Sequence, residues 1–172
     1  MTLIPAWIND TLVPVEKLRV HKMGLKHKAV SVFVMDGDNV LIQRRALSKY
    51  HTPGLWANTC CTHPQWGEDI LECAKRRLKE ELGIDGVEPV FCDRLEYRAD
   101  VGKGMIEHEI VDLFTASACS KTLVQKLNPD EVAETKWVDI HKLVAMVVKE
   151  PTKYSPWLKI YLEDHLNLVI KN

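Results

Sequence analysis

Residues 68–84 read Glu-Asp-Ile-Leu-Glu-Cys-Ala-Lys-Arg-Arg-Leu-Lys-Glu-Glu-Leu-Gly-Ile. Apolar residues recur every four positions, at Ile70, Ala74, Leu78 and Leu82, which predicts a helix over 68–82 with one buried face. Acidic residues in the first turn and a glycine after the last turn are typical helix boundaries. The stretch therefore predicts an amphipathic helix.

Strand patterns flank this helix on both sides. Residues 29–35 and 40–45 form an extended pair around a turn at 36–39, and residues 90–98 and 105–115 form another around 101–104. A short strand over 134–140 and a helix over 140–149 follow. A last helix begins at Ser155-Pro156 and carries Leu158, Leu162, Leu166 and Val169 on one side. No motif is assigned before Lys17. The pattern predicts an α/β (α+β) fold with a mixed β-sheet sandwiched between helices.

Composition narrows the class of protein. A chain of 172 residues fits one domain, and 23 basic against 24 acidic residues argue against non-specific nucleic-acid binding. No apolar run reaches the roughly 20 residues of a membrane span, and no secretory signal opens the chain. Five cysteines, an odd number at irregular spacing, favour a reducing cytoplasm over a disulfide framework. The composition therefore favours a soluble enzyme or binding domain.

The charged face of the 68–82 helix has two interpretations. Arg76 and Glu80, like Arg77 and Glu81, are four residues apart and so are neighbours on the helix surface. Such pairs are common and weak, so a solvated face held by ion pairs is the ordinary interpretation. The alternative is a functional role for this face, which is favoured by the preceding loop with Cys61 and His63 and by the charged end of the helix.

Two glutamates in the 105–114 strand also have two interpretations. Alternation places Glu107 and Glu109 on one face together with Met105, Val111 and Leu113. Two carboxylates among apolar neighbours are costly unless they bind a metal or share a proton. The alternative is an exposed edge face with two solvated glutamates.

Three histidines complete a possible metal site. His21 and His27 are expected just before the first strand, and His63 lies two residues after Cys61. Three imidazoles and two carboxylates suit one divalent ion. Taken singly, each histidine is more often an ordinary surface or core residue.

Residues 62–84 resemble the Nudix box, G-x5-E-x7-R-E-U-x-E-E-x-G-U, where U is a bulky aliphatic residue. The matching positions are Glu68, Arg76, Leu78, Glu80, Glu81, Gly83 and Ile84. Thr62 replaces the first glycine of the box, and Arg77 replaces a glutamate. In Nudix hydrolases the helical carboxylates hold the cations that activate water on a diphosphate. Arg77 weakens the hydrolase interpretation and puts a cation where a diphosphate would lie.

Taken together, these residues resemble the type I isopentenyl-diphosphate isomerases, a branch of the Nudix superfamily. The resemblance rests on residues 44–49 (RRALSK), 56–64 (WANTCCTHP), 97–99 (YRA), 107–109 (EHE) and 155–157 (SPW), besides the helix with Arg77. It covers about 17–157 and implies a single Nudix-type domain over 1–172. The Cys-x-His-Pro phrase with Glu-x-Glu downstream is its most specific part.

The resemblance also implies a role for each matching residue. The catalytic set would be Cys61 and Glu109, on opposite faces of the double bond, with Tyr97 near the proton-transfer group and Trp157 facing the reacting carbon. The ligands of a tightly bound metal would be His21, His27, His63, Glu107 and Glu109. Glu81 and the backbone carbonyl of Cys61 would hold a second ion, Mg²⁺. The diphosphate would be bound by Lys17, Arg45, Lys49 and Arg77.

The activity implied is conversion of isopentenyl diphosphate to dimethylallyl diphosphate in isoprenoid biosynthesis. The expected cofactors are Mg²⁺ and Mn²⁺, with Zn²⁺ possible at the His/Glu site. The expected partner is the small-molecule substrate, with no nucleic acid and no membrane, and the protein is expected to be a monomer or weak dimer. The alternatives are a Nudix hydrolase and a catalytically inactive module that binds a diphosphate or a metal.

Overall fold

Nine strands join in one mixed sheet in the computed structural model, which describes residues 2–170. The strands are β1 (Leu3–Ile8), β2 (Thr11–Glu16), β3 (Lys26–Asp36), β4 (Asn39–Arg45), β5 (Trp56–Ala57), β6 (Cys60–Thr62), β7 (Val90–Gly102), β8 (Met105–Ser117) and β9 (Val132–Asp139). β3 pairs in parallel with β8 and antiparallel with β1, β4 and β6. The predicted hairpins β3–β4 and β7–β8 are both confirmed.

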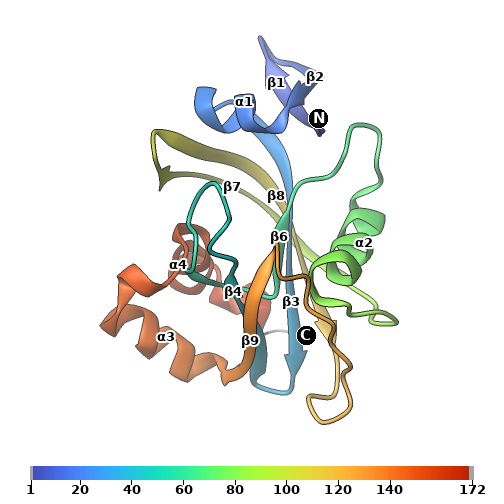
Figure 1. The fold of residues 1–172 in the computed structure, drawn as a ribbon, viewed down its shortest axis with the longest axis vertical. Coiled ribbons are helices and arrows are strands. Elements are labelled where there is room, and N and C mark those ends of the chain that lie inside the picture. The colour runs from blue at the N-terminus through green and yellow to red at the C-terminus, as the bar shows by residue number, and fades with distance from the viewer. Residues whose placement is uncertain (1, 171–172) are drawn as a thin grey trace.

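The helices cover both faces of this sheet. They are α1 (Lys17–Met23), α2 (Ile70–Leu82), α3 (Ile140–Lys149), α4 (Pro156–Asp164) and α5 (Leu166–Val169), with a 3-10 turn η1 at Pro151–Lys153. Figure 1 shows α2 on one side of the central strands and α3 and α4 on the other. The predicted sandwich of a mixed sheet between helices is confirmed.

Alternation along β3 produces the two layers of core. Ala29 and Phe33 face the layer that contains α3, α4 and α5, whereas Val30 and Val32 face the layer that contains α2. Successive side chains of a strand point to opposite faces, so a strand covered on both sides must be apolar on both. This explains why residues 29–35 read as a continuous apolar run.

The α2 helix is fixed at both ends by its own sequence. The Asp69 side chain accepts hydrogen bonds from the backbone N–H groups of Leu71 and Glu72, so the helix begins at Ile70, two residues later than the sequence predicted. Gly83 ends it with a φ of 66°. A side chain at Gly83 would lie 2.6 Å from the Lys126 nitrogen, so both conformation and space require glycine.

The N-terminal segment contains structure that the sequence analysis did not assign. β1 and β2 form a hairpin whose turn residues, Asn9 and Asp10, both have positive φ. Glu16 then caps α1 by accepting hydrogen bonds from the Leu18 and Arg19 N–H groups. This hairpin and helix lie above the end of β3 in Figure 1 and close one end of the sheet.

Two sequence expectations are corrected. The last helix is not continuous, because His165 leaves the helical conformation with a φ of −133° and separates α4 from α5. Leu162 and Val169 still contact the same core layer. His27 does not precede the first of the predicted strands but lies inside β3, where it pairs with Ala6 of β1.

No helix in the range 2–170 is long and apolar enough to cross a membrane.

Candidate active site

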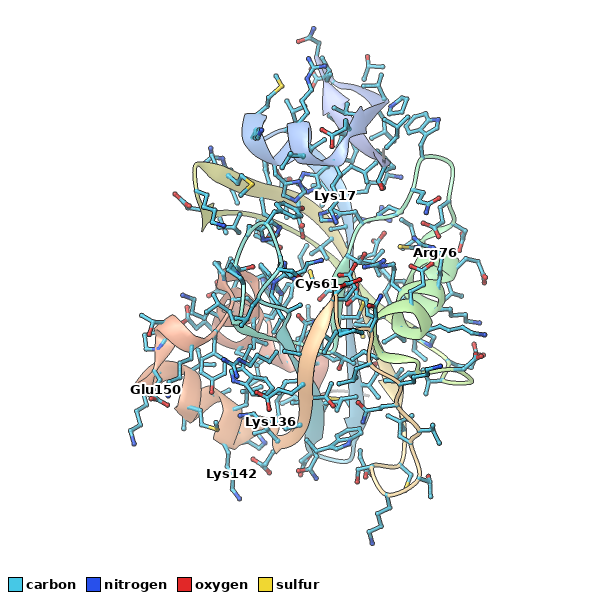
Figure 2. All side chains as sticks on the ribbon, in the orientation of Figure 1. Lys17, Cys61, Arg76, Lys136, Lys142 and Glu150 are labelled. Atoms are coloured by element: carbon cyan, nitrogen blue, oxygen red, sulfur yellow. The ribbon has the colours of Figure 1, made fainter. Side chains whose placement is uncertain are left out.

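The strand β6 places two adjacent cysteines on opposite sides of the sheet. Cys60 is fully buried and packs in the layer with α2, whereas Cys61 packs against the other layer and lines a pocket. Alternation in an extended segment produces this separation. Figure 2 shows Cys61 near the centre of the molecule. Only Cys61 is therefore positioned to meet a ligand in this pocket.

The two glutamates of β8 are buried, so the interpretation as an exposed edge face is wrong. Glu107 is 2% exposed and Glu109 is 0% exposed. Glu109 pairs with His27 of β3 on one side and with Tyr97 of β7 on the other. The Tyr97 hydroxyl donates to Glu109 at 2.7 Å and lies 3.2 Å from Glu107. Three adjacent strands thus place a histidine, a carboxyl and a phenol in one row.

Three histidines converge beside Glu109. The Nε2 atom of His63 lies 3.0 Å from a Glu109 oxygen and 3.1 Å from the Nε2 atom of His27. The His21 ring centroid is 5.0 Å from those of both His27 and His63. One ligand atom from each histidine lies within 4.8 Å of the others.

The chemistry of this cluster fits a divalent metal ion. The Nδ1 atoms of His21 and His27 lie 2.7 Å from backbone carbonyl oxygens of Lys17 and Leu25, and a ring that donates there through Nδ1 directs its Nε2 atom into the cluster, where it can coordinate a metal. The His21 Nε2 atom is buried without a hydrogen-bond partner among the described residues. Inward lone pairs beside a buried carboxylate need a cation.

The pKa directions follow from burial and from this arrangement. Burial raises the pKa of Glu107 well above its usual range, and the neighbouring Glu109 adds to it. Burial also disfavours ionised Glu109, but hydrogen bonds with His27 and His63 outweigh it and hold the Glu109 pKa well below its usual range. Burial, followed by repulsion from the two carboxylates, raises the pKa of the Cys61 thiol and of the Tyr97 hydroxyl. The two carboxyl groups therefore differ in protonation.

A group of cations lines the same pocket. Its members are Lys17 from α1, Arg45 from β4, Lys49 from the following loop and Arg77 from α2. Burial, together with repulsion from Lys49 and Arg77, lowers the pKa of Lys17 to about 8. Positive charges that crowd one another in a buried pocket favour a multiply charged anion.

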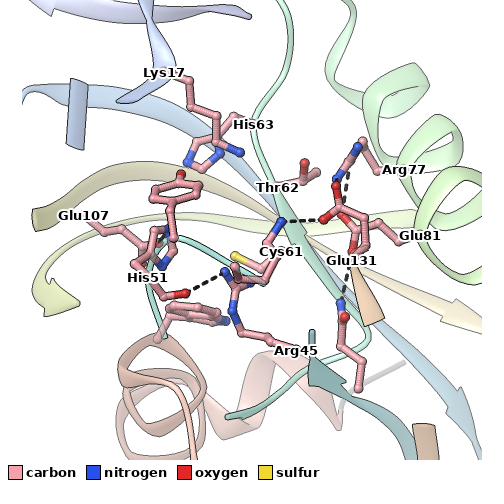
Figure 3. A pocket seen from close by; sticks show the side chains of 14 residues that line it. Lys17, Arg45, His51, Cys61, Thr62, His63, Arg77, Glu81, Glu107 and Glu131 are labelled. Atoms are coloured by element: carbon pink, nitrogen blue, oxygen red, sulfur yellow. Dashed lines mark hydrogen bonds and ion pairs between the residues drawn. The ribbon is translucent and has the colours of Figure 1, made fainter. Parts of the chain in front are cut away.

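Arg77 and Glu81 belong to this cationic side of the pocket. Arg77 Nη2 donates to Glu81 at 2.6 Å, and the other Glu81 oxygen accepts from Gln43 at 3.1 Å. Figure 3 shows Arg77, Glu81 and Glu131 on one side of the pocket and His51 and Glu107 on the other, with Cys61 between them. Glu81 thus lies apart from the histidine cluster.

Trp157 forms part of the pocket wall and of the core. It is 1% exposed, lies at the start of α4 and packs in the layer with α3. The Arg45 guanidinium carbon is 5.2 Å from its ring centroid. The ring therefore lies between a cation and the core, and it lines the pocket.

All the site residues predicted from the sequence lie in one cluster. Those that line the pocket are Lys17, Arg45, Lys49, Cys61, His63, Arg77, Glu81, Glu107 and Trp157. The others lie directly behind it, in contact with lining residues, and are His21, His27, Tyr97 and Glu109.

Sequence reasoning missed His51 and Glu131, which also line the pocket. Glu131 forms ion pairs with Lys49 at 2.5 Å and with Arg77 at 3.4 Å. Both missed residues lie in irregular segments without a periodic pattern. The only signal for His51 was its place two residues after Lys49, in a loop closed by Pro53-Gly54.

Comparison with known protein families defines the class of this protein. The NUDIX domain model matches residues 25–158, so the chain belongs to the Nudix family, as the sequence resemblance indicated.

Individual relatives identify a more specific family within the Nudix class. An isopentenyl-diphosphate Delta-isomerase from Dinoroseobacter shibae is 63% identical over 95% of this chain and 92% of its own. Another, from Cereibacter sphaeroides, is 59% identical over 97% of this chain and 94% of its own. The chain belongs to the isopentenyl-diphosphate Delta-isomerase family.

Solved structures agree on the fold. The DR0079 protein from Deinococcus radiodurans superposes with a TM-score of 0.74 at 14% identity, covering 95% of this chain and 98% of its own. A MutT protein from Methanosarcina mazei has a TM-score of 0.65 at 18% identity, covering 83% and 95%. At these identities the likeness establishes the Nudix fold.

Proposed function

We propose that this protein interconverts isopentenyl diphosphate and dimethylallyl diphosphate, an isomerase reaction of isoprenoid biosynthesis that the family's name implies. One observation carries the proposal: Cys61 lies in a single pocket between the buried carboxyls of β8 and the cations of α1, β4 and α2. Membership of the isomerase family supports it.

The reaction explains why both halves of the pocket are needed. Moving an isolated double bond by one position requires one proton to be added and another removed, and no neighbouring carbonyl is present to share the charge. Cys61 and Glu109 would be the two proton-transfer groups, and Tyr97 holds Glu109 in place through its hydroxyl hydrogen bond.

A cationic reaction centre also requires an electron-rich environment from which water is excluded. The Trp157 ring offers a π face, and cation–π contact in a desolvated site stabilises a cation by about 2 kcal/mol. The burial of Glu107, Glu109 and Tyr97 shows how little water reaches this end of the pocket. Water exclusion prevents capture of the reactive species.

The diphosphate would bind at the cationic side. Arg77 and Lys49 form ion pairs with Glu131, and these pairs would rearrange to accept phosphate oxygens. Binding energy from the diphosphate, which does not react, can then hold the hydrocarbon end between the proton-transfer groups.

The metal ligands in this proposal are His21, His27, His63, Glu107 and Glu109. A bound divalent ion would neutralise the two buried carboxyls and polarise a coordinated carboxyl for proton transfer. We propose Mn²⁺ or Zn²⁺ here because the histidine set suits them, and Mg²⁺ at Glu81 with the diphosphate and the Cys61 carbonyl.

We further propose that residues 1–172 act as one domain, with the motif-bearing part at about 17–157, as a monomer or weak dimer in the cytoplasm. The free thiols of Cys60, Cys61, Cys73 and Cys119 support a reducing compartment.

The experiment that tests the function is incubation of the protein with isopentenyl diphosphate and Mg²⁺ or Mn²⁺ in deuterated water, followed by NMR. The expected result is dimethylallyl diphosphate that carries solvent deuterium, with no phosphate released. Phosphate release without isomerisation would instead indicate a Nudix hydrolase. Diphosphate binding without any reaction would indicate a binding module.

A further inference from the structure

A fourth histidine lies against the metal-binding cluster. His51 is 4% exposed, and its Nε2 atom is 3.5 Å from a Glu107 oxygen. Its ring stacks on that of His21, with centroids 5.4 Å apart and planes inclined by 24°. One ligand atom each from His51, His21 and Glu107 lies within 4.8 Å of the other two.

The surrounding chain fixes the position of His51. Arg45 donates to the backbone carbonyl oxygens of His51 at 3.3 Å and of Thr52 at 3.2 Å. Thr52 has a φ of 46°, a conformation that a β-branched residue adopts only when its surroundings impose it. The Nδ1 atom of His51 lies 3.0 Å from the Thr52 hydroxyl, so the other ring nitrogen faces the cluster.

The two groups of ligand atoms would surround the same ion rather than two separate ions. His21 belongs to both groups, and its Nδ1 atom is engaged by the Lys17 carbonyl. Only its Nε2 atom is free to coordinate, and one lone pair binds one ion. An ion bound to His21 is therefore adjacent to His51 as well as to His27 and His63.

We propose that His51 is a further protein ligand of the metal ion at this site. The inference rests on the metal site of the proposed function and adds a fourth imidazole to it. The full ligand set would be His21, His27, His51, His63, Glu107 and Glu109. A fourth imidazole favours a transition metal such as Zn²⁺ over Mg²⁺, because Mg²⁺ prefers oxygen ligands.

The test counts histidines on the metal directly. Protein with ¹⁵N-labelled histidine side chains is loaded with ¹¹³Cd²⁺, and each ring nitrogen bound to cadmium is split by the metal nucleus. The wild-type protein is expected to show four split histidine signals, and His51→Gln three. Because the wild-type count alone decides the number of ligands, the test does not depend on the variant folding.

An affinity measurement provides a second readout. His51→Gln is expected to weaken Zn²⁺ binding about tenfold or more, measured by competition with a chelator, with a smaller effect on Mg²⁺. The control is His141→Gln, which changes an exposed histidine on α3 and should leave both affinities unchanged.

Two results would overturn the inference. One would leave the proposed metal site intact, and the other would overturn that site as well. Three split signals in the wild-type protein would show that His51 only positions Glu107, and the metal site would stand. No split signal at all would overturn the metal site together with this inference. Neither result depends on isomerase activity, which the deuterium experiment tests separately.

Discussion

Two clusters of charged side chains lie within this small fold, and they are built in opposite ways. On the outer side of α2, Arg76 bridges Glu68 and Glu80 at 2.5–2.8 Å, and all three side chains are partly exposed. Around β8, Glu107 and Glu109 are buried beside histidines whose inward nitrogens are not all paired. Figure 2 places Arg76 at the side of the molecule and Cys61 near its centre.

The difference distinguishes a cluster that only stabilises the fold from a cluster that is suited to bind a ligand. Each charged side chain of the outer cluster has an oppositely charged partner and stays in contact with water, so no ligand is needed there. The inner cluster removes ionisable groups from water without satisfying them, which is costly unless a ligand completes it.

The pair Cys60 and Cys61 gives the largest contrast. Cys61→Ala should reduce turnover about 1,000-fold, because a proton-transfer group is lost, with little effect on the melting temperature. Cys60→Ala should retain activity while losing about 1 kcal/mol of unfolding free energy, because it empties a core position. Steady-state kinetics and thermal melts measure both. Comparable turnover in the two variants would contradict the assignment of Cys61.

Arg76 and Arg77 are adjacent and both form an ion pair with Glu80, but of the two only Arg77 lines the pocket that contains Cys61. Arg77→Gln should raise KM for the diphosphate substrate about 10- to 100-fold, since a hydrogen bond between charged groups contributes about 1.5–3 kcal/mol. Arg76→Gln should leave KM within about twofold. An equal KM for both variants would show that α2 does not bind the diphosphate.

The pH profile tests the cationic side of the pocket. The Lys17 pKa of about 8 means that Lys17 is protonated below this pH and neutral above it. The value of kcat/KM should therefore fall as pH rises through about 8. Lys17→Arg, which keeps its charge, should move this limb to higher pH. If kcat/KM of Lys17→Arg fell at the same pH as that of the wild-type protein, the ionisation would belong to another group.

The smallest effect is expected in the outer cluster. Burial raises the pKa of Glu68, but hydrogen bonding to Arg76 outweighs it, so the folded pKa lies below the usual 4.5. The ion pair therefore stabilises the fold above that pH and is lost as pH falls through the folded pKa. Glu68→Gln should cost about 1 kcal/mol of unfolding free energy at neutral pH and less below about pH 4, with unchanged kcat. Denaturant titrations at the two pH values measure this.

The sequence predicted most of the scaffold because its signals were local. The α2 helix carried its apolar period, its cap and Gly83, and β8 carried its alternation, so their positions followed directly. The hairpin of residues 3–16 was missed because its turn, Asn9-Asp10, is a weaker signal than a glycine turn. The break at His165 was missed because the apolar period continues across it.

The site was predicted through a resemblance rather than through periodicity. Alternation placed Glu107 and Glu109 on one face, but only pairing between distant strands brings His27 and Tyr97 to either side of Glu109. His51 could not be placed, because its position depends on Arg45 holding an irregular loop and on the unusual φ of Thr52.

In the proposed function, one pocket holds a metal ion at one end and a diphosphate at the other, with Cys61 between them. A crystal grown with Mn²⁺ and dimethylallyl diphosphate tests it most directly, because anomalous scattering locates the metal independently. The predicted result is a manganese peak between His21, His27 and His63, phosphate density against Lys49 and Arg77, and the hydrocarbon beside Cys61. A peak elsewhere, or a hydrocarbon tail directed away from Cys61, would contradict the claim.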